Sequence, residues 1–181
     1  DIVSVIRDAS RLIVNAGETV HRGIELGLDY RINDEWQLGL SVTRTDQLYK
    51  DFTYVFFSRS CFCNQQINFA GNQVGKAPEN LANVRLAYSP QLLPEFKAEL
   101  EWDSVCEYYT DETNTQTYDG HSLVNLRLNY RLSDQFDIYL RGANLNNTLY
   151  STYTSNQVND PDVSYRPGMP KSCFMGLRWA L

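Results

Sequence analysis

Apolar and polar residues alternate along this chain with a period of two, and the alternation recurs in short segments. In the clearest pair, residues 24–32 and 36–43 alternate on either side of Asn33-Asp34, which predicts two strands joined by a tight turn. The same pattern predicts strands at 82–88, 96–103, 124–132, 136–141 and 171–181, and a further strand within residues 2–14. We therefore predict an all-β, antiparallel chain of about eight strands.

The last segment keeps this alternation to the final residue. Leu181, Trp179, Leu177, Met175 and Cys173 fall on one side, and mostly small or polar residues fall on the other. A terminal strand with one apolar side suits a barrel in a membrane, because its outside contacts lipid and closure must pair the last strand with the first. The segment therefore favours an up-and-down transmembrane β-barrel.

The connections between the predicted strands alternate between short and long. Tight connections at 33–34, 89–95 and 133–134 alternate with long ones at 50–78, 110–120 and 149–170. We expect residues 50–78 to form a long, irregular loop. Outer-membrane barrels have short periplasmic turns and long extracellular loops, so we expect the long connections to face outward and the C-terminus to lie in the periplasm. Aromatic residues flank the tight turns, as an aromatic girdle at the inner interface would: Tyr30, Trp36, Tyr88, Phe96, Tyr130 and Phe136.

The polar sides of two predicted strands carry many charges. In residues 96–103, every second position is charged: Lys97, Glu99, Glu101 and Asp103. These side chains could not enter a dry core, so they indicate a water-filled lumen. The strand at 124–132 places Arg127, Asn129 and Arg131 on its polar side. We favour a hydrated wall in which acidic and basic strands pair and contact a plug; a ligand path along these residues is the alternative.

Composition narrows the class of protein. The mean hydropathy is −0.42 and no run of about 18 apolar residues is present, which excludes a membrane-spanning helix but not a barrel. The net charge of −6 argues against a nucleic-acid partner held by phosphate contacts. The chain starts in the apolar segment 2–6, without Met or a signal peptide, so we expect a fragment of a longer protein.

Four short segments, in this order, resemble motifs of TonB-dependent outer-membrane receptors. They are Asn15-Ala16-Gly17 with Gly23-Ile24-Glu25-Leu26, Gly71-Asn72 with Ala77-Pro78-Glu79, Asn144-Leu145-Asn146-Asn147 with Tyr150, and Arg166-Pro167-Gly168-Met169-Pro170-Lys171. The final residue departs from the family, which usually ends in Phe where this chain has Leu181.

The resemblance implies that residues 1–181 are the C-terminal portion of the receptor barrel, about the last eight of 22 strands, without the plug domain and the earlier strands. It implies TonB-dependent uptake of a ferric siderophore or a similar scarce ligand across the outer membrane of a Gram-negative cell. The implied partners are outer-membrane lipid, the plug and remaining strands, the ligand, and a TonB-type energy-coupling protein acting through the missing N-terminal part. Ligand contacts are expected in the outer loops 51–76, 110–119 and 149–169.

The sequence offers few candidates for other chemistry. Four cysteines lie at the long-loop end of the strands and are disulfide candidates with the pairing left open: Cys61, Cys63, Cys106 and Cys173. Zinc sites prefer wider cysteine spacing, so no metal site is predicted, and His21 and His121 are expected to be solvated or girdle residues. No catalytic triad, catalytic carboxylate pair or phosphate-binding loop can be argued, so we predict no enzyme activity and no cofactor.

Two other interpretations fit part of the pattern. A self-contained eight-stranded outer-membrane anchor or adhesin could close around its own side chains, but it would have to neutralise Lys97, Glu99, Glu101 and Asp103 in a narrow interior. A soluble ligand-binding barrel would turn the apolar sets inward, which the apolar end of the chain at 179–181 disfavours. For a receptor fragment, we expect the isolated strands not to refold stably, because two sheet edges would lie open.

Overall fold

A computed structural model of the chain describes residues 2–7, 10–15, 17–156 and 162–179. Within these residues, no helix is long and apolar enough to cross a membrane. The strands are β1 Ile2–Arg7, β2 Ser10–Asn15, β3 Glu18–Arg31, β4 Trp36–Asp51, β5 Thr53–Ser58, β6 Cys63–Asn68, β7 Asn80–Tyr88, β8 Phe96–Val105, β9 Tyr108–Tyr109, β10 Thr117–Tyr118, β11 His121–Ser133, β12 Phe136–Ala143, β13 Ser151–Ser155, β14 Ser164–Pro167 and β15 Ser172–Trp179.

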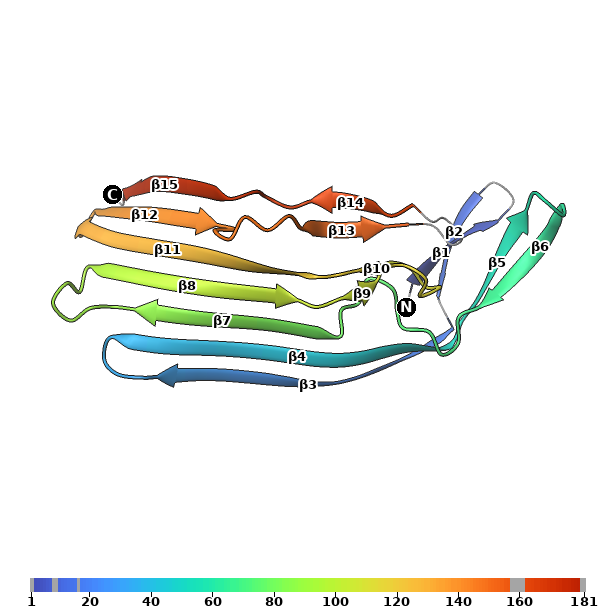
Figure 1. Cartoon of the computed structure of the whole chain (residues 1–181), viewed down its shortest axis with the longest axis horizontal. Helices are drawn as coiled ribbons and strands as arrows, with labels where there is room; N and C mark the ends of the chain where they lie inside the picture. The colour runs from blue at the N-terminus through green and yellow to red at the C-terminus, as the bar shows by residue number, and fades with distance from the viewer. Residues whose placement is uncertain (1, 8–9, 16, 157–161, 180–181) are drawn as a thin grey trace.

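Seven of these strands form one long antiparallel sheet in the order β15-β12-β11-β8-β7-β4-β3 (Figure 1). Among these seven strands, each pairs with the strand that precedes it and the strand that follows it along the chain, as in an up-and-down barrel wall. Strands β3 and β15 are the two edges of the sheet and do not pair with each other. The all-β antiparallel prediction is confirmed, and the sheet has two open edges.

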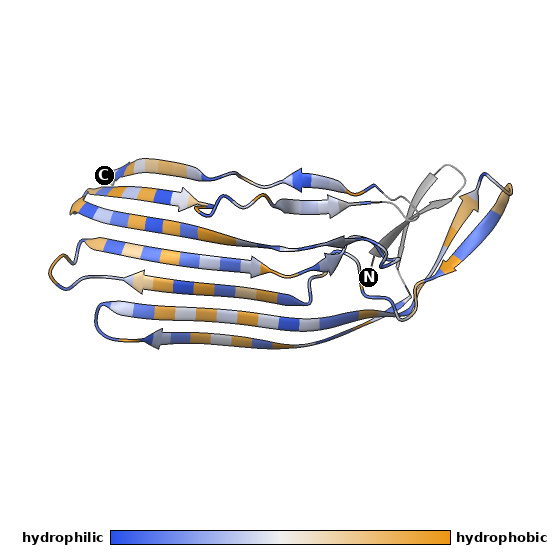
Figure 2. Cartoon of the chain, in the orientation of Figure 1, coloured by the Kyte–Doolittle hydropathy of each residue, from blue (hydrophilic) through white to orange (hydrophobic). Residues whose placement is uncertain are grey.

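The strand register gathers the apolar residues on one face of the sheet. Leu40 lies opposite Val84, Val84 opposite Trp102, and Trp102 opposite Val124, so one apolar row crosses β4, β7, β8 and β11. Figure 2 shows the resulting alternation of hydrophobic and hydrophilic residues along the strands. Large apolar side chains on this face remain exposed, including Met175 at 78%. An apolar face that none of the described residues covers fits contact with lipid.

The apolar face has a clear outer limit on β3 and β4. On this face, Ile24 of β3 is followed by Arg22, and Val42 of β4 is followed by Arg44. Arg44 lies opposite Ile24 and Arg22 lies opposite Asp46, so charge interrupts the apolar rows of the two strands within one step of each other. From Trp36 to this limit, β4 has about the nine residues that a tilted strand needs to cross a bilayer.

The tight connections of the predicted pattern are confirmed. Between β3 and β4, the Asn33 side-chain oxygen accepts hydrogen bonds from the backbone amides of Glu35 (2.9 Å) and Trp36 (2.8 Å), which closes the turn. The main sheet has seven strands, compared with about eight expected, because the segment within 2–14 forms the separate pair β1-β2. Ala16 of the first motif and the terminal Leu181 lie outside the described residues.

The prediction that residues 50–78 form an irregular loop is wrong. This connection contains the hairpin β5-β6, and the connections at 110–120 and 149–170 contain the strand pairs β9-β10 and β13-β14 (Figure 1). The three tight connections all lie at the opposite end of the sheet (Figure 1). The two ends of the sheet therefore differ, with simple turns at one end and structured extensions at the other.

Candidate functional site

Charged side chains on the polar face pair across neighbouring strands. Arg127 of β11 forms ion pairs with both Glu99 and Glu101 of β8, with 2.9 Å between Arg127 Nη2 and Glu101 Oε2. The prediction that the acidic set on β8 pairs with the basic set on β11 is confirmed at Arg127. Arg131 instead lies 3.6 Å from Asp137 of β12, its partner in the strand register.

Amide side chains extend this network over the polar face. Asp103 accepts hydrogen bonds from Asn83 Nδ2 at 2.6 Å and from Asn125 Nδ2 at 3.1 Å, which links β7, β8 and β11. The distance from Arg85 Nη2 of β7 to Asp29 Oδ1 of β3 is 3.9 Å. The polar residues thus satisfy one another across the wall, as expected for the hydrated inside of a barrel.

The buried hydrophobic core lies beyond the apolar face, at the elaborated end of the sheet. Phe69 is 1% exposed, and its ring centroid lies 5.3 Å from that of Phe52 and 6.5 Å from that of Tyr49. Tyr54 adds a stacked ring at 6.3 Å from Phe69. Burial, with a smaller contribution from the charge of Glu112, raises the pKa of the Tyr49 phenol to about 12. This aromatic cluster fixes the base of the β5-β6 hairpin.

Polar contacts hold the connection at 110–119 against the connection at 51–76. Asn114 Nδ2 donates to the Gln73 carbonyl at 2.9 Å, and the Gln73 amide donates to Asn114 Oδ1 at 2.7 Å. Asn114 adopts a left-handed backbone conformation with φ of 56°, which Asn tolerates better than most residues. Asn72 Nδ2 adds a bond of 2.8 Å to the Glu112 carbonyl.

The connection at 110–119 also contacts the connection at 149–169. The Ser151 amide donates to the Tyr118 hydroxyl at 3.0 Å, and Asn156 Nδ2 donates to Asp111 Oδ2 at 2.8 Å. Burial raises the pKa of the Tyr118 phenol. The three connections predicted to be outer loops therefore form one continuous structure.

Aromatic and basic side chains meet on the exposed part of this structure. The Tyr153 ring is half exposed, and the ring lies 5.4 Å from Lys76 Nζ and 5.8 Å from Arg166 Cζ. These residues come from the connections at 51–76 and 149–169. An aromatic ring between two cations provides both a stacking surface and positive charge for a ligand.

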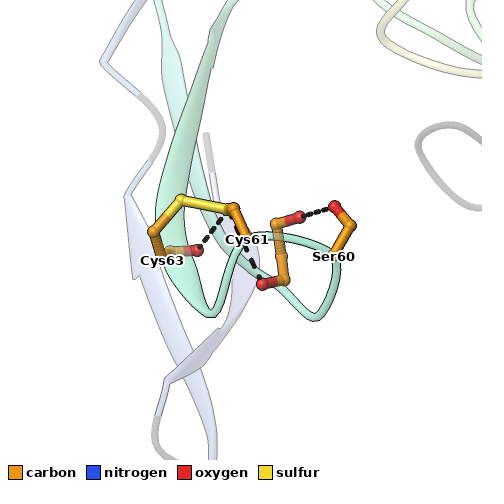
Figure 3. Close-up of a disulfide and its surroundings, with 4 residues drawn as sticks. Ser60, Cys61 and Cys63 are labelled. Carbon is orange, nitrogen blue, oxygen red and sulfur yellow. Dashed lines mark hydrogen bonds between the residues drawn. A yellow bond between two sulfur atoms is a disulfide. The ribbon is translucent and has the colours of Figure 1, made fainter.

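The four cysteines separate into one disulfide and two thiols. Cys61 and Cys63 form a disulfide at the tip of the β5-β6 hairpin (Figure 3). Beside it, the Ser60 hydroxyl makes a 2.8 Å hydrogen bond to the hydroxyl of Ser58. Cys106 and Cys173 are free and exposed. The pairing that the sequence leaves open is thus local to one hairpin in the structure.

The histidines make hydrogen bonds within the wall. His21 Nδ1 lies 2.9 Å from Gln47 Oε1, and His121 Nδ1 lies 2.9 Å from the Tyr118 hydroxyl. The described residues contain no group of three or more His, Cys, Asp or Glu side chains arranged to hold a metal ion.

The chain matches a family model described as "TonB dependent receptor-like, beta-barrel" over residues 2–145. It belongs to this family. TonB-dependent receptors are outer-membrane proteins of Gram-negative bacteria, which agrees with the exposed apolar face and the polar opposite face.

Two individual receptors illustrate the similarity. The chain is 26% identical over 141 residues to the probable TonB-dependent siderophore receptor PiuA of Acinetobacter baumannii, a match that covers 76% of the chain and 18% of PiuA. It superposes on the crystal structure of PiuA with a TM-score of 0.74 at 19% identity, covering 98% of the chain and 24% of PiuA. The ferric yersiniabactin uptake receptor FyuA of Yersinia pestis gives a TM-score of 0.71 at 18% identity, covering 93% of the chain and 24% of FyuA.

Several residues of the outer structure could not be identified from the sequence. Asp111 and Thr154 are each 1% exposed, although both lie in polar segments without alternation. Tyr153, Lys76 and Arg166 meet only because separate connections fold together. The spacing of these residues along the chain contains no signal for either arrangement.

Proposed function

We propose that this chain forms part of the wall and outer surface of an outer-membrane receptor that takes up a ferric siderophore or a similar scarce ligand. The observation that carries the proposal is the asymmetry of the sheet, which combines a polar inner face with structured extensions at one end only. Family membership and the siderophore receptors among the relatives support it. The protein acts by binding and transport, without catalysis.

The outer extensions capture the ligand in this proposal. Tyr153 with Lys76 and Arg166 would contact an anionic or aromatic part of the ligand, since stacking and positive charge are available at the same place. The hydrated inner face, including the Arg127 ion pairs, contacts the plug domain of the complete receptor. The extensions face the outside of the cell, and the C-terminus lies in the periplasm.

Three partners follow from this role. Outer-membrane lipid covers the apolar face, and the plug and remaining strands of the same receptor adjoin the open edges at β3 and β15. A TonB-type energy-coupling protein acts through the N-terminal part of the receptor. The chain spans 18% of the curated relative, so the plug and the coupling segment would belong to sequence beyond these residues.

The two other interpretations from the sequence are less consistent with the fold. A self-contained eight-stranded barrel would pair its first and last strands, whereas β3 and β15 lie at opposite edges of the described sheet. A soluble ligand-binding barrel would cover its apolar face, whereas Ile24 on that face is 77% exposed.

Uptake of ferric ligands by intact cells tests the proposal. Cells that lack the receptor gene are complemented with the complete wild-type gene, and uptake of a panel of ⁵⁵Fe-labelled siderophores is measured with and without a functional TonB protein. We expect uptake of at least one ferric complex that requires both the gene and TonB. Tyr153→Ala should reduce this uptake about tenfold or more, while Leu92→Ala, which changes a 98%-exposed side chain in the tight connection between β7 and β8, should not.

Either of two results would contradict the proposal. Uptake that is independent of TonB would remove the coupled mechanism. If no labelled complex, and no other scarce nutrient in the same assay, depends on the gene, the receptor role itself fails.

A further inference from the structure

Asp111 is a buried carboxylate with incomplete hydrogen bonding. It lies between β9 and β10 and is 1% exposed. Its Oδ2 atom accepts hydrogen bonds of 2.8 Å from Thr113 Oγ1 and from Asn156 Nδ2, whereas Oδ1 is buried without a partner. Among the described residues, no Lys, Arg or His forms an ion pair with it. A buried carboxylate in this state is costly unless something further compensates its charge.

Two other buried oxygen atoms, both in the connection at 149–169 that contacts Asp111, also lack hydrogen-bond partners. They are Oγ1 of Thr154, a residue that is 1% exposed, and Oδ1 of Asn156. Residues 154 and 156 are two apart on an extended segment, so their side chains project to the same side. The 2.8 Å bond from Asn156 to Asp111 places this side against the connection at 110–119. In the described part of the chain, these three residues contain all the buried side-chain nitrogen and oxygen atoms that have no hydrogen-bond partner.

The backbone around Asp111 is held tightly in place. A Cβ atom added to Gly75 would lie 2.8 Å from the Asp111 carbonyl carbon, so the connection at 51–76 packs directly against this residue. Asn114 Nδ2 donates to the Asp111 carbonyl at 3.2 Å. The carboxylate is therefore presented by a fixed backbone, as in a site that a ligand completes without large rearrangement.

The chemistry of the three oxygens identifies the class of ligand. A carboxylate, an amide carbonyl and a hydroxyl are hard oxygen donors, which Ca²⁺ prefers and which it completes with water to six to eight ligands. None of the three residues supplies an imidazole or a thiolate, so copper and zinc are disfavoured. Mg²⁺ requires stricter octahedral geometry and gives up its water less readily than Ca²⁺.

We propose that Asp111, Thr154 and Asn156 bind one Ca²⁺ ion that joins the connections at 110–119 and 149–169. A single carboxylate among neutral ligands gives weak binding, about 10⁻⁴ to 10⁻³ M, as in extracellular calcium modules. The ion would stabilise the outer structure where these two connections meet. The site goes beyond the proposed uptake function, since it concerns the outer structure whether or not a siderophore is the ligand.

Calcium titration of the complete receptor in detergent tests the site directly. Protein treated with a chelator is titrated with CaCl₂ in a calorimeter, with no siderophore present, so failure here leaves the uptake function untouched. We expect Asp111→Asn to weaken the site at least tenfold, because it removes the charge and keeps the shape. Asp119→Asn removes an exposed carboxylate of the same connection and should leave binding unchanged. MgCl₂ should bind more weakly than CaCl₂.

A second variant keeps the test informative if Asp111→Asn folds poorly. Thr154→Val keeps the side-chain volume and removes the hydroxyl, and we expect it to weaken calcium binding about threefold. Folding of each variant is checked by its melting curve in chelator. If the wild-type receptor binds no calcium beyond what the Asp111→Asn and Thr154→Val variants bind, the unpartnered oxygens bind water alone and the proposal is overturned.

Discussion

Removing the Phe69 side chain should detach the β5-β6 hairpin from the sheet without unfolding the sheet itself. Phe69 is 1% exposed, and its ring packs against Phe52, Tyr49 and Tyr54. Phe→Ala changes at fully buried sites cost about 3–5 kcal/mol. The cluster lies beyond the apolar face of the sheet, so this loss falls on the hairpin and the connections beside it, and not on the strand pairs of the apolar face.

The predicted loss of stability can be converted into a faster rate of hydrogen exchange at backbone amides. Because about 1.4 kcal/mol corresponds to a tenfold change in an equilibrium constant, the loss predicts roughly 100-fold to 4,000-fold faster exchange of amides that open with the hairpin. The reporting amides include Phe69, which donates to the Phe52 carbonyl at 2.8 Å, and Gly71, which donates to the Tyr49 carbonyl at 2.8 Å. Exchange in β11 and β12 should stay at the wild-type rate.

The assay is hydrogen–deuterium exchange of the complete receptor in detergent, followed by mass spectrometry of peptides within 49–72. Phe62→Ala is the matched control, because Phe62 lies in the same hairpin and is 83% exposed. The reasoning is refuted if Phe69→Ala and Phe62→Ala exchange alike, or if Phe69→Ala accelerates β11 and β12 as much as the hairpin.

Three further predictions concern other parts of the chain. Gly120→Ala should lower stability in detergent melts by at least about 1 kcal/mol more than Gly71→Ala; both residues have positive φ, but only at Gly120 would a Cβ strike backbone, at 2.2 Å. A double-mutant cycle of Arg127→Met and Glu101→Gln should give a coupling of about 0.5–1 kcal/mol, because the arginine is 43% exposed. The raised pKa of the Tyr49 phenol means that the protonated phenol contributes fully to stability below pH 10, and that this contribution is lost as the pH rises towards 12. Tyr49→Phe should therefore reduce the loss of stability between pH 10 and pH 12 in pH-dependent melts.

A different result would contradict each of these three predictions. Equal effects of the two glycine substitutions would mean that the contact at Gly120 relaxes freely. A coupling near zero would mean that Arg127 and Glu101 act independently, despite the 2.9 Å contact. An alkaline melting profile unchanged by Tyr49→Phe would mean that the phenol ionises without cost in the folded receptor.

The main sheet could be predicted from the sequence because each strand has its own alternating pattern. The alternation in residues 24–32 and 36–43 identifies the apolar side of each strand, and the Asn33 side chain accepts the hydrogen bonds that close the turn between them. The pairing of Arg127 with Glu99 and Glu101 followed from the same alternation, because antiparallel register places the polar sides of β8 and β11 together.

The outer structure could not be predicted in the same way. Strand β6 is largely polar, and its hairpin is fixed by packing of Phe69 on Tyr49 of β4 and on Phe52, and by a disulfide within the tip. Asp111 and Thr154 are buried by contacts between segments more than 40 residues apart, as the bond from Asn156 to Asp111 illustrates. Local patterns contain no information about such contacts, so polar connections appeared irregular.

The arrangement of the sheet in the membrane is tested most directly by labelling of single cysteines on intact cells. In a receptor with Cys106 and Cys173 replaced by Ser, Leu149→Cys introduces a thiol in an outer extension and Leu92→Cys introduces one in a tight turn, at positions 93% and 98% exposed. We predict that a membrane-impermeant maleimide labels Leu149→Cys on intact cells and Leu92→Cys only after the outer membrane is permeabilised. Labelling of Leu92→Cys on intact cells would contradict the proposed orientation and, with it, the capture of ligand by the outer extensions.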